Sequence, residues 1–79
     1  MKKILIVEDT ISIREEIATI LKFEGFDVYE ASDGIEGLQE IKKINPDLII
    51  SDISMPKMNG FEMLKEIQLM NDVANIPLI

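Results

Sequence analysis

The stretch that decides the fold runs from residue 47 to residue 60 and reads Asp47-Leu48-Ile49-Ile50-Ser51-Asp52-Ile53-Ser54-Met55-Pro56-Lys57-Met58-Asn59-Gly60. A short apolar run ends at a single acid, Asp52, and a loop that contains proline, asparagine and glycine follows it. The length and composition of the run are typical of a buried strand. An acid at the end of a buried strand is unfavourable unless a site uses it, so the pattern indicates Asp52 as the working residue.

The composition limits the kinds of chemistry that the chain can perform. It has 79 residues, a formal net charge of −7, and neither cysteine nor histidine. The length allows one domain at most. The missing residue types exclude disulfides, thiolate or imidazole zinc sites, and nucleophiles activated by histidine. What remains is carboxylate chemistry with hard cations, or simple binding.

The same numbers bear on partners and location. The negative charge disfavours direct contact with nucleic acid, because phosphate backbones require clustered Lys and Arg. Only four apolar residues follow the amino-terminal lysines, whereas a secretory signal needs about 7–15. No stretch approaches the roughly 18 apolar residues of a membrane span. We therefore expect a cytoplasmic protein without membrane contact, and the absence of cysteine suits a reducing compartment.

Strand and helix patterns alternate along the whole chain. Strands are predicted at residues 4–7, 26–31 and 48–50, and residues 76–79 resemble the opening of a fourth. Helical spacing of apolar residues lies between them and is interrupted at Gly25 and at Asn45-Pro46. The order βαβαβαβ predicts an α/β fold, with a parallel sheet, right-handed crossovers and helices on both faces.

The helical segments also carry predictions about their ends and buried faces. The first helix has two candidate N-caps, Thr10 and Ser12, the second of which has Glu15 at capping-box spacing. The second helix has the same N-cap and N3 spacing in Asp33 and Glu36. The apolar faces are predicted to consist of Ile13, Ile17, Ile20 and Leu21 in the first helix, Ile35, Leu38 and Ile41 in the second, and Phe61, Leu64, Ile67 and Gln68 in the third.

The predicted strand order brings three acids together. Residues 26–31 mix polar and apolar types and suit an edge strand, which favours the order 2-1-3-4. Ligands of such open sheets bind beyond the carboxyl ends of the strands, where the winding direction reverses. The first strand ends in Glu8-Asp9 and the third ends in Asp52. Three carboxylates in one crevice repel one another unless a cation screens them, and Mg²⁺ prefers such oxygen ligands.

Simpler roles exist for each acid, and other phosphate-site motifs are absent. Asp9 could cap the following helix, Glu8 could be solvated, and Asp52 could cap a turn. Neither G-x-G-x-x-G nor G-x-x-x-x-G-K-[ST] occurs in the sequence. The D-x-D of haloacid-dehalogenase-type phosphatases is missing after the first strand, and Asp52-Ile53-Ser54 lacks the second acid.

The chain resembles a response-regulator receiver domain (CheY-like), which has the flavodoxin-like fold of two-component signalling. The resemblance covers essentially all of the chain and rests on several motifs in combination. These are Ile4-Leu5-Ile6-Val7-Glu8-Asp9, Ala31-Ser32-Asp33-Gly34 with Glu36, Asp47-Leu48-Ile49-Ile50-Ser51-Asp52, and Met55-Pro56-Lys57-Met58-Asn59-Gly60.

The resemblance implies a role for each site residue. Asp52 would be the phosphoacceptor, which takes a phosphoryl group from a phosphohistidine of a sensor histidine kinase. Glu8, Asp9, Asp52 and the backbone carbonyl of Ser54 would bind Mg²⁺, which offsets the negative charge of both reactants. The chain would then be a signalling module and not an enzyme.

The resemblance also implies that residues 1–79 form a single partial receiver domain. The family's fourth helix, fifth strand and fifth helix have no counterpart here, nor do the hydroxyl and the lysine that contact the phosphate. We expect this truncation to impair switching and to leave the strand at residues 76–79 as an exposed edge that self-associates or swaps elements. Two alternative functions follow. One is an assembly half-fold without phosphotransfer, and the other is a Mg²⁺ phosphohydrolase, which would lack a second general acid-base group.

Overall fold

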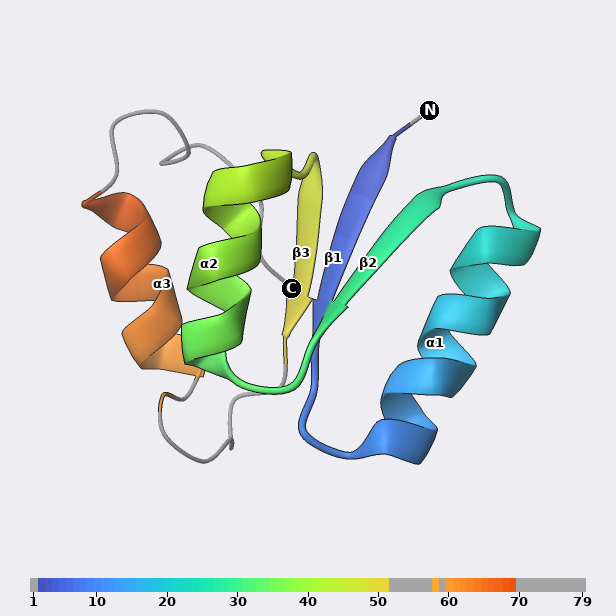
Figure 1. Ribbon diagram of the computed structural model, residues 1–79, viewed down its shortest axis with the longest axis horizontal. Helices are drawn as coiled ribbons and strands as arrows, with labels where there is room; N and C mark the ends of the chain where they lie inside the picture. The colour runs from blue at the N-terminus through green and yellow to red at the C-terminus, as the bar shows by residue number, and fades with distance from the viewer. Residues whose placement is uncertain (1, 52–57, 59, 70–79) are drawn as a thin grey trace.

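Three strands and three helices alternate in the structure, a computed structural model that describes residues 2–51, 58 and 60–69. Their bounds are β1 Lys3–Val7, α1 Ile11–Phe23, β2 Asp27–Ala31, α2 Gly34–Ile44, β3 Leu48–Ser51 and α3 Gly60–Gln68 (Figure 1). The predicted alternation is confirmed up to α3. The fourth strand predicted at residues 76–79 lies outside the described residues.

The strands form a parallel sheet in the order β2-β1-β3, as predicted for these three strands. Val7, the last residue of β1, lies opposite both Ala31 of β2 and Ser51 of β3. The carboxyl ends of all three strands therefore reach the same level of the sheet. The mixed composition of β2 agrees with its place at an edge, where Glu30 is exposed.

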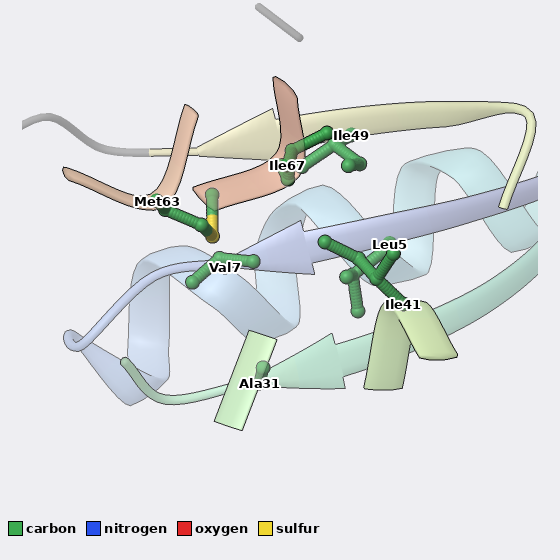
Figure 2. Packing of buried hydrophobic residues seen from close by; sticks show 7 residues of the cluster. All are labelled: Leu5, Val7, Ala31, Ile41, Ile49, Met63 and Ile67. Atoms are coloured by element: carbon green, nitrogen blue, oxygen red, sulfur yellow. The ribbon is translucent and has the colours of Figure 1, made fainter. Parts of the chain in front are cut away.

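The larger core lies between the sheet and the pair α2 and α3. It joins seven buried side chains (Figure 2): Leu5, Val7, Ala31, Ile41, Ile49, Met63 and Ile67. All three strands contribute to it, and Leu5 and Val7 of β1 do so together because alternate residues of a strand point to the same face. α2 packs against β1, β2 and α3.

A smaller core lies on the opposite face, beneath α1. Ile4, Ile6 and Ala18 are buried there, and partly buried side chains such as Ile17 and Leu21 surround them. α1 packs against β1 and β2, while α2 and α3 lie on the other side of the sheet (Figure 1). The prediction of helices on both faces is thus confirmed.

The predicted apolar face of α1 was wrong at two positions. Ile13 and Ile20 are 46% and 63% exposed, whereas Ala18 is only 3% exposed. The buried stripe is centred on the small side chain of Ala18, because α1 lies over β1 and β2 and not over β3. This placement leaves the flank of α1 that carries Ile13 and Ile20 uncovered by any described element.

The predicted apolar faces of α2 and α3 were also wrong at one position each. Ile35 is 44% exposed and Phe61 is 63% exposed, although both were predicted to face the core. Each is in the first turn of its helix. In α3 the core positions are Met63 and Ile67, which are four residues apart and so lie one above the other.

The helix ends follow their local sequence signals. Thr10 is the N-cap residue of α1, so the predicted alternative at Ser12 was wrong. The predicted N-cap of α2 is confirmed, because the Asp33 carboxylate accepts a hydrogen bond from the Glu36 N–H at 2.8 Å. The Glu36 carboxylate in turn accepts from the Ser32 N–H at 3.2 Å. After α1, Gly25 has a φ of +94°, the left-handed conformation that glycine adopts readily. α2 ends before Asn45, whose φ is +50°.

Candidate functional site

Two of the predicted site residues, Glu8 and Asp9, lie at the carboxyl end of β1. The Glu8 N–H donates a hydrogen bond to the Ala31 carbonyl at 3.1 Å, which continues the pairing of β1 with β2. Glu8 is only 9% exposed, whereas Asp9 is exposed. The site therefore begins with one carboxylate packed into the protein and a second that faces solvent.

The surroundings of these acids exclude the simpler roles that the sequence left open for them. Glu8 is buried rather than solvated, and its Oε2 accepts a hydrogen bond from the Thr10 N–H at 3.0 Å. Thr10, and not Asp9, occupies the N-cap position of α1. A buried carboxylate at a strand end remains unfavourable unless its environment compensates for the loss of water.

The register of the sheet relates these acids to the segment that contains Asp52. Val7 precedes Glu8, Ser51 precedes Asp52, and Val7 and Ser51 lie opposite each other in β1 and β3. Asp52 and Ser54 themselves lie outside the described residues. Within residues 2–51, 58 and 60–69, no group of three acidic, histidine or cysteine side chains could hold a metal. The convergence of all three acids therefore stays a prediction.

The described part of the site fits a magnesium ion in its donor chemistry. Glu8 and Asp9 offer carboxylate oxygens, which Mg²⁺ prefers, and they offer no nitrogen or sulfur. Mg²⁺ also keeps several water ligands, and the exposed position of Asp9 gives water access. Glu8 and Asp9 are thus suited to bind this ion together with oxygens from other segments.

Arg14 belongs to the same neighbourhood, and the sequence reasoning missed it. Its Nη1 donates a hydrogen bond to the Glu8 carbonyl at 2.8 Å, and its Nε forms an ion pair with Glu30 Oε1 at 3.1 Å. The helical spacing places Arg14 on the buried face of α1 only once the structure shows that Ala18 is buried. Arg14 lies four residues before the buried Ala18, so a charged side chain was placed on the face of α1 that packs against the sheet.

Gly34, the first residue of α2, lies close to Met58. A Cβ atom at this position would lie 2.6 Å from the Met58 carbonyl oxygen and 2.8 Å from the Met58 Cβ. Backbone atoms cannot move aside cheaply, so only glycine fits without a shift of one segment. Gly34 and Met58 therefore approach each other too closely for any larger residue at position 34.

Gly34→Ala is expected to lower the free energy of unfolding by about 1–3 kcal/mol, as overpacking does. Helix propensity alone predicts the opposite sign, since alanine stabilises a helix by roughly 0.5–1 kcal/mol relative to glycine. Urea denaturation followed by circular dichroism measures the difference. Gln39→Ala, an exposed position of α2, is the control and should be nearly neutral. A Gly34→Ala variant as stable as the wild type would show that the contact is unimportant.

Comparison with known proteins places the chain in a family. The family model of the response regulator receiver domain matches residues 4–79. The CpxR homolog of Haemophilus influenzae, a transcriptional regulatory protein, is 43% identical over all 79 residues, which make up 33% of its length. The hybrid signal transduction histidine kinase D of Dictyostelium discoideum is 38% identical over 76 residues, or 5% of its length. The chain thus spans a third or less of these two relatives.

Solved structures show the same fold. The chemotaxis response regulator CheY4 of Vibrio cholerae superimposes with a TM-score of 0.94 at 40% identity, covering 99% of this chain and 65% of the other. The response regulator TrrA of Thermotoga maritima, in complex with Mg²⁺-BeF, superimposes with a TM-score of 0.83 at 40% identity. The match covers 87% of this chain and 60% of the TrrA chain. Among the described residues, no helix is both long and apolar enough to cross a membrane.

Sequence match, strand order and fold agree with one another, so the chain belongs to the response regulator receiver domain family of two-component signalling and has its flavodoxin-like, CheY-like fold.

Proposed function

We propose that this receiver domain accepts a phosphoryl group on Asp52 from a sensor histidine kinase, in a reaction that requires Mg²⁺. A phosphoacceptor role is general to the family to which the chain belongs. Three parts are proposed for this chain: Asp52 as the acceptor, Mg²⁺ as the metal, and a sensor histidine kinase as the donor. It acts as a signalling domain and not as an enzyme.

One observation carries the proposal: the pairing of Val7 with Ser51. It puts the residues that directly precede Glu8 and Asp52 at the same level of adjacent parallel strands. The carboxyl edge of such a sheet, at the point where the winding reverses between β1 and β3, is where ligands bind. The buried Glu8 and the exposed Asp9 already occupy this edge.

The chemistry assigns a separate task to each residue. An Asp52 carboxylate oxygen attacks phosphorus, the bond from phosphorus to the donor's imidazole nitrogen breaks, and the imidazole leaves as the phosphoryl group becomes an acyl phosphate. Glu8, Asp9, Asp52 and the Ser54 carbonyl would hold Mg²⁺. When bound, the ion neutralises charge that would otherwise repel the nucleophile from the phosphoryl oxygens. The Mg²⁺-BeF complex of the relative TrrA supports this choice of ion.

The charge of the chain bears on its other contacts and on its location. With 15 acidic and 8 basic residues, the chain is proposed not to contact nucleic acid directly and to work in the cytoplasm. Self-association through the edge at residues 76–79, or by exchange of elements, remains a prediction, because those residues lie outside the described part of the chain.

Incubation with acetyl phosphate, followed by intact-mass measurement, tests the proposal. The wild-type chain should gain one phosphoryl group when Mg²⁺ is present and none when EDTA replaces it. A phosphorylated sensor histidine kinase should transfer its group under the same conditions. No mass gain with Mg²⁺, or an equal gain in EDTA, would contradict the proposal and leave the assembly role as the better account.

A further inference from the structure

Arg14 links three elements at the carboxyl edge of the sheet. Its side chain is 16% exposed and extends from the first turn of α1. One nitrogen donates to the Glu8 carbonyl, at 2.8 Å, in the turn between β1 and α1. Another pairs with Glu30 at the exposed edge strand β2, at 3.1 Å. A single guanidinium thus connects the turn of the acid pair to two neighbouring elements.

The bond to Glu8 fixes the backbone that leads into Asp9. The Glu8 carbonyl belongs to the peptide group that joins these two residues, and a peptide group is rigid and planar. Holding its oxygen therefore restricts the position of the Asp9 nitrogen and the direction in which the Asp9 side chain leaves the backbone. The guanidinium suits this task, since its planar, rigid set of donors serves two acceptors at once.

The Glu8 side chain reinforces the same turn from the other side. Its Oε2 accepts a hydrogen bond from the Thr10 N–H at 3.0 Å, while its own N–H bonds to Ala31. The backbone N–H, the backbone carbonyl and one carboxylate oxygen of Glu8 are therefore all engaged. Of these three contacts, only the one to Arg14 comes from a side chain outside the turn and the sheet.

The positive charge of Arg14 and its hydrogen bond to the turn have opposite expected effects on Mg²⁺ binding. A positive group beside the acid pair repels a second cation, so its removal should strengthen Mg²⁺ binding if charge dominates. If the orientation of the turn dominates, its removal should weaken binding. The two accounts therefore differ in sign, which makes the role of Arg14 testable.

We infer that Arg14 is a positioning residue for Mg²⁺, because it holds the Glu8–Asp9 peptide in the orientation that directs both carboxylates to the ion. The inference rests on the proposed function, since it presupposes that these acids bind Mg²⁺. It adds to the proposed site a side chain of α1, which is itself paired with Glu30 of β2.

Calorimetric titration of Mg²⁺ into the wild type, Arg14→Gln and Arg14→Lys tests the inference. The dissociation constant of Arg14→Gln should rise about tenfold, the lower end of what loss of a group that orients metal ligands causes. Arg14→Lys keeps the charge but loses the forked geometry, so its dissociation constant should lie between those of the wild type and Arg14→Gln. Lys43→Gln is the control, because it removes the same charge at an exposed position of α2. Tighter or unchanged binding by Arg14→Gln would overturn the inference.

A measurement without metal separates this inference from the proposed function. Hydrogen exchange at the Thr10 amide reports the turn directly, because that N–H donates to Glu8. We expect faster exchange in Arg14→Gln than in Lys43→Gln, with thermal unfolding confirming that both are folded. Equal exchange would overturn the positioning role. A wild type that shows slow Thr10 exchange but no Mg²⁺ binding would instead overturn the metal site of the proposed function, and Arg14 would then only stabilise the turn.

Discussion

Replacing Asp52 with asparagine is expected to abolish phosphoryl uptake from acetyl phosphate while the chain stays folded. The amide has nearly the shape of the carboxylate, but it lacks the charged oxygen that attacks phosphorus. The strand that precedes it should be unaffected, since Ile49 remains fully buried in the core beneath α2 and α3. Intact-mass measurement after treatment with acetyl phosphate and Mg²⁺ gives the result directly.

A matched substitution shows whether the loss is specific to the position. Asp27 begins β2 and lies opposite Lys3, at the amino ends of the strands and far from the proposed site. Asp27→Asn removes the same charge and should retain phosphoryl uptake. Uptake by Asp52→Asn that equals the wild type would place the acceptor elsewhere and contradict the assignment of Asp52.

Leu5→Ala is expected to leave the chain largely unfolded at room temperature. Leu5 is completely buried at the middle of β1 and is part of the larger core (Figure 2). Removing such a side chain typically costs about 2–5 kcal/mol. A single core in a chain below about 80 residues rarely supplies more than about 3–5 kcal/mol of net stability. The loss is therefore comparable with the whole stability of the fold.

Circular dichroism and urea denaturation measure this effect, and α1 offers the control. Ile20 is an aliphatic residue of similar volume that is 63% exposed. Ile20→Ala should change the free energy of unfolding by no more than about 0.5 kcal/mol, as is usual for surface positions. A Leu5→Ala variant with the wild-type unfolding midpoint would mean that the larger core does not hold the sheet together.

The strands and their order could be predicted because their signals are local. Continuous apolar runs mark β1 and β3 as buried strands, and the mixed composition of β2 marks an edge strand. The N-cap bond between Asp33 and Glu36 is equally local, since both residues lie within one turn. For these elements, propensity and tertiary packing favour the same structure.

The buried faces of the helices were harder to predict, because they depend on where each helix lies over the sheet. Ile13 and Ile20 fit a helical apolar stripe, but α1 is centred over β1 and β2 and turns Ala18 inward instead. In the same way, Met63 and Ile67 face the core while Phe61 does not. Spacing along one helix does not reveal which strand lies beneath it.

The acids of the candidate site could be predicted from the sequence, but the contribution of Arg14 was missed. Glu8 and Asp9 are adjacent in sequence and follow a strand, so their place at the carboxyl edge could be inferred from topology. The contacts of Arg14 to the Glu8 carbonyl and to Glu30 cross from α1 to two other segments. Such contacts depend on the three-dimensional packing, which also decided that the face of α1 with Arg14 and Ala18 is the one turned toward the sheet.

The central claim is that Glu8, Asp9 and Asp52 form one Mg²⁺ site at the carboxyl edge of the sheet. A Mg²⁺ titration followed by the backbone amide NMR signals of these three residues tests it most directly. The account predicts that all three signals move along one saturation curve with a common dissociation constant, while the signal of Asp27 at the opposite end stays in place. A response of Glu8 and Asp9 without Asp52, or separate curves for the two strands, would contradict it.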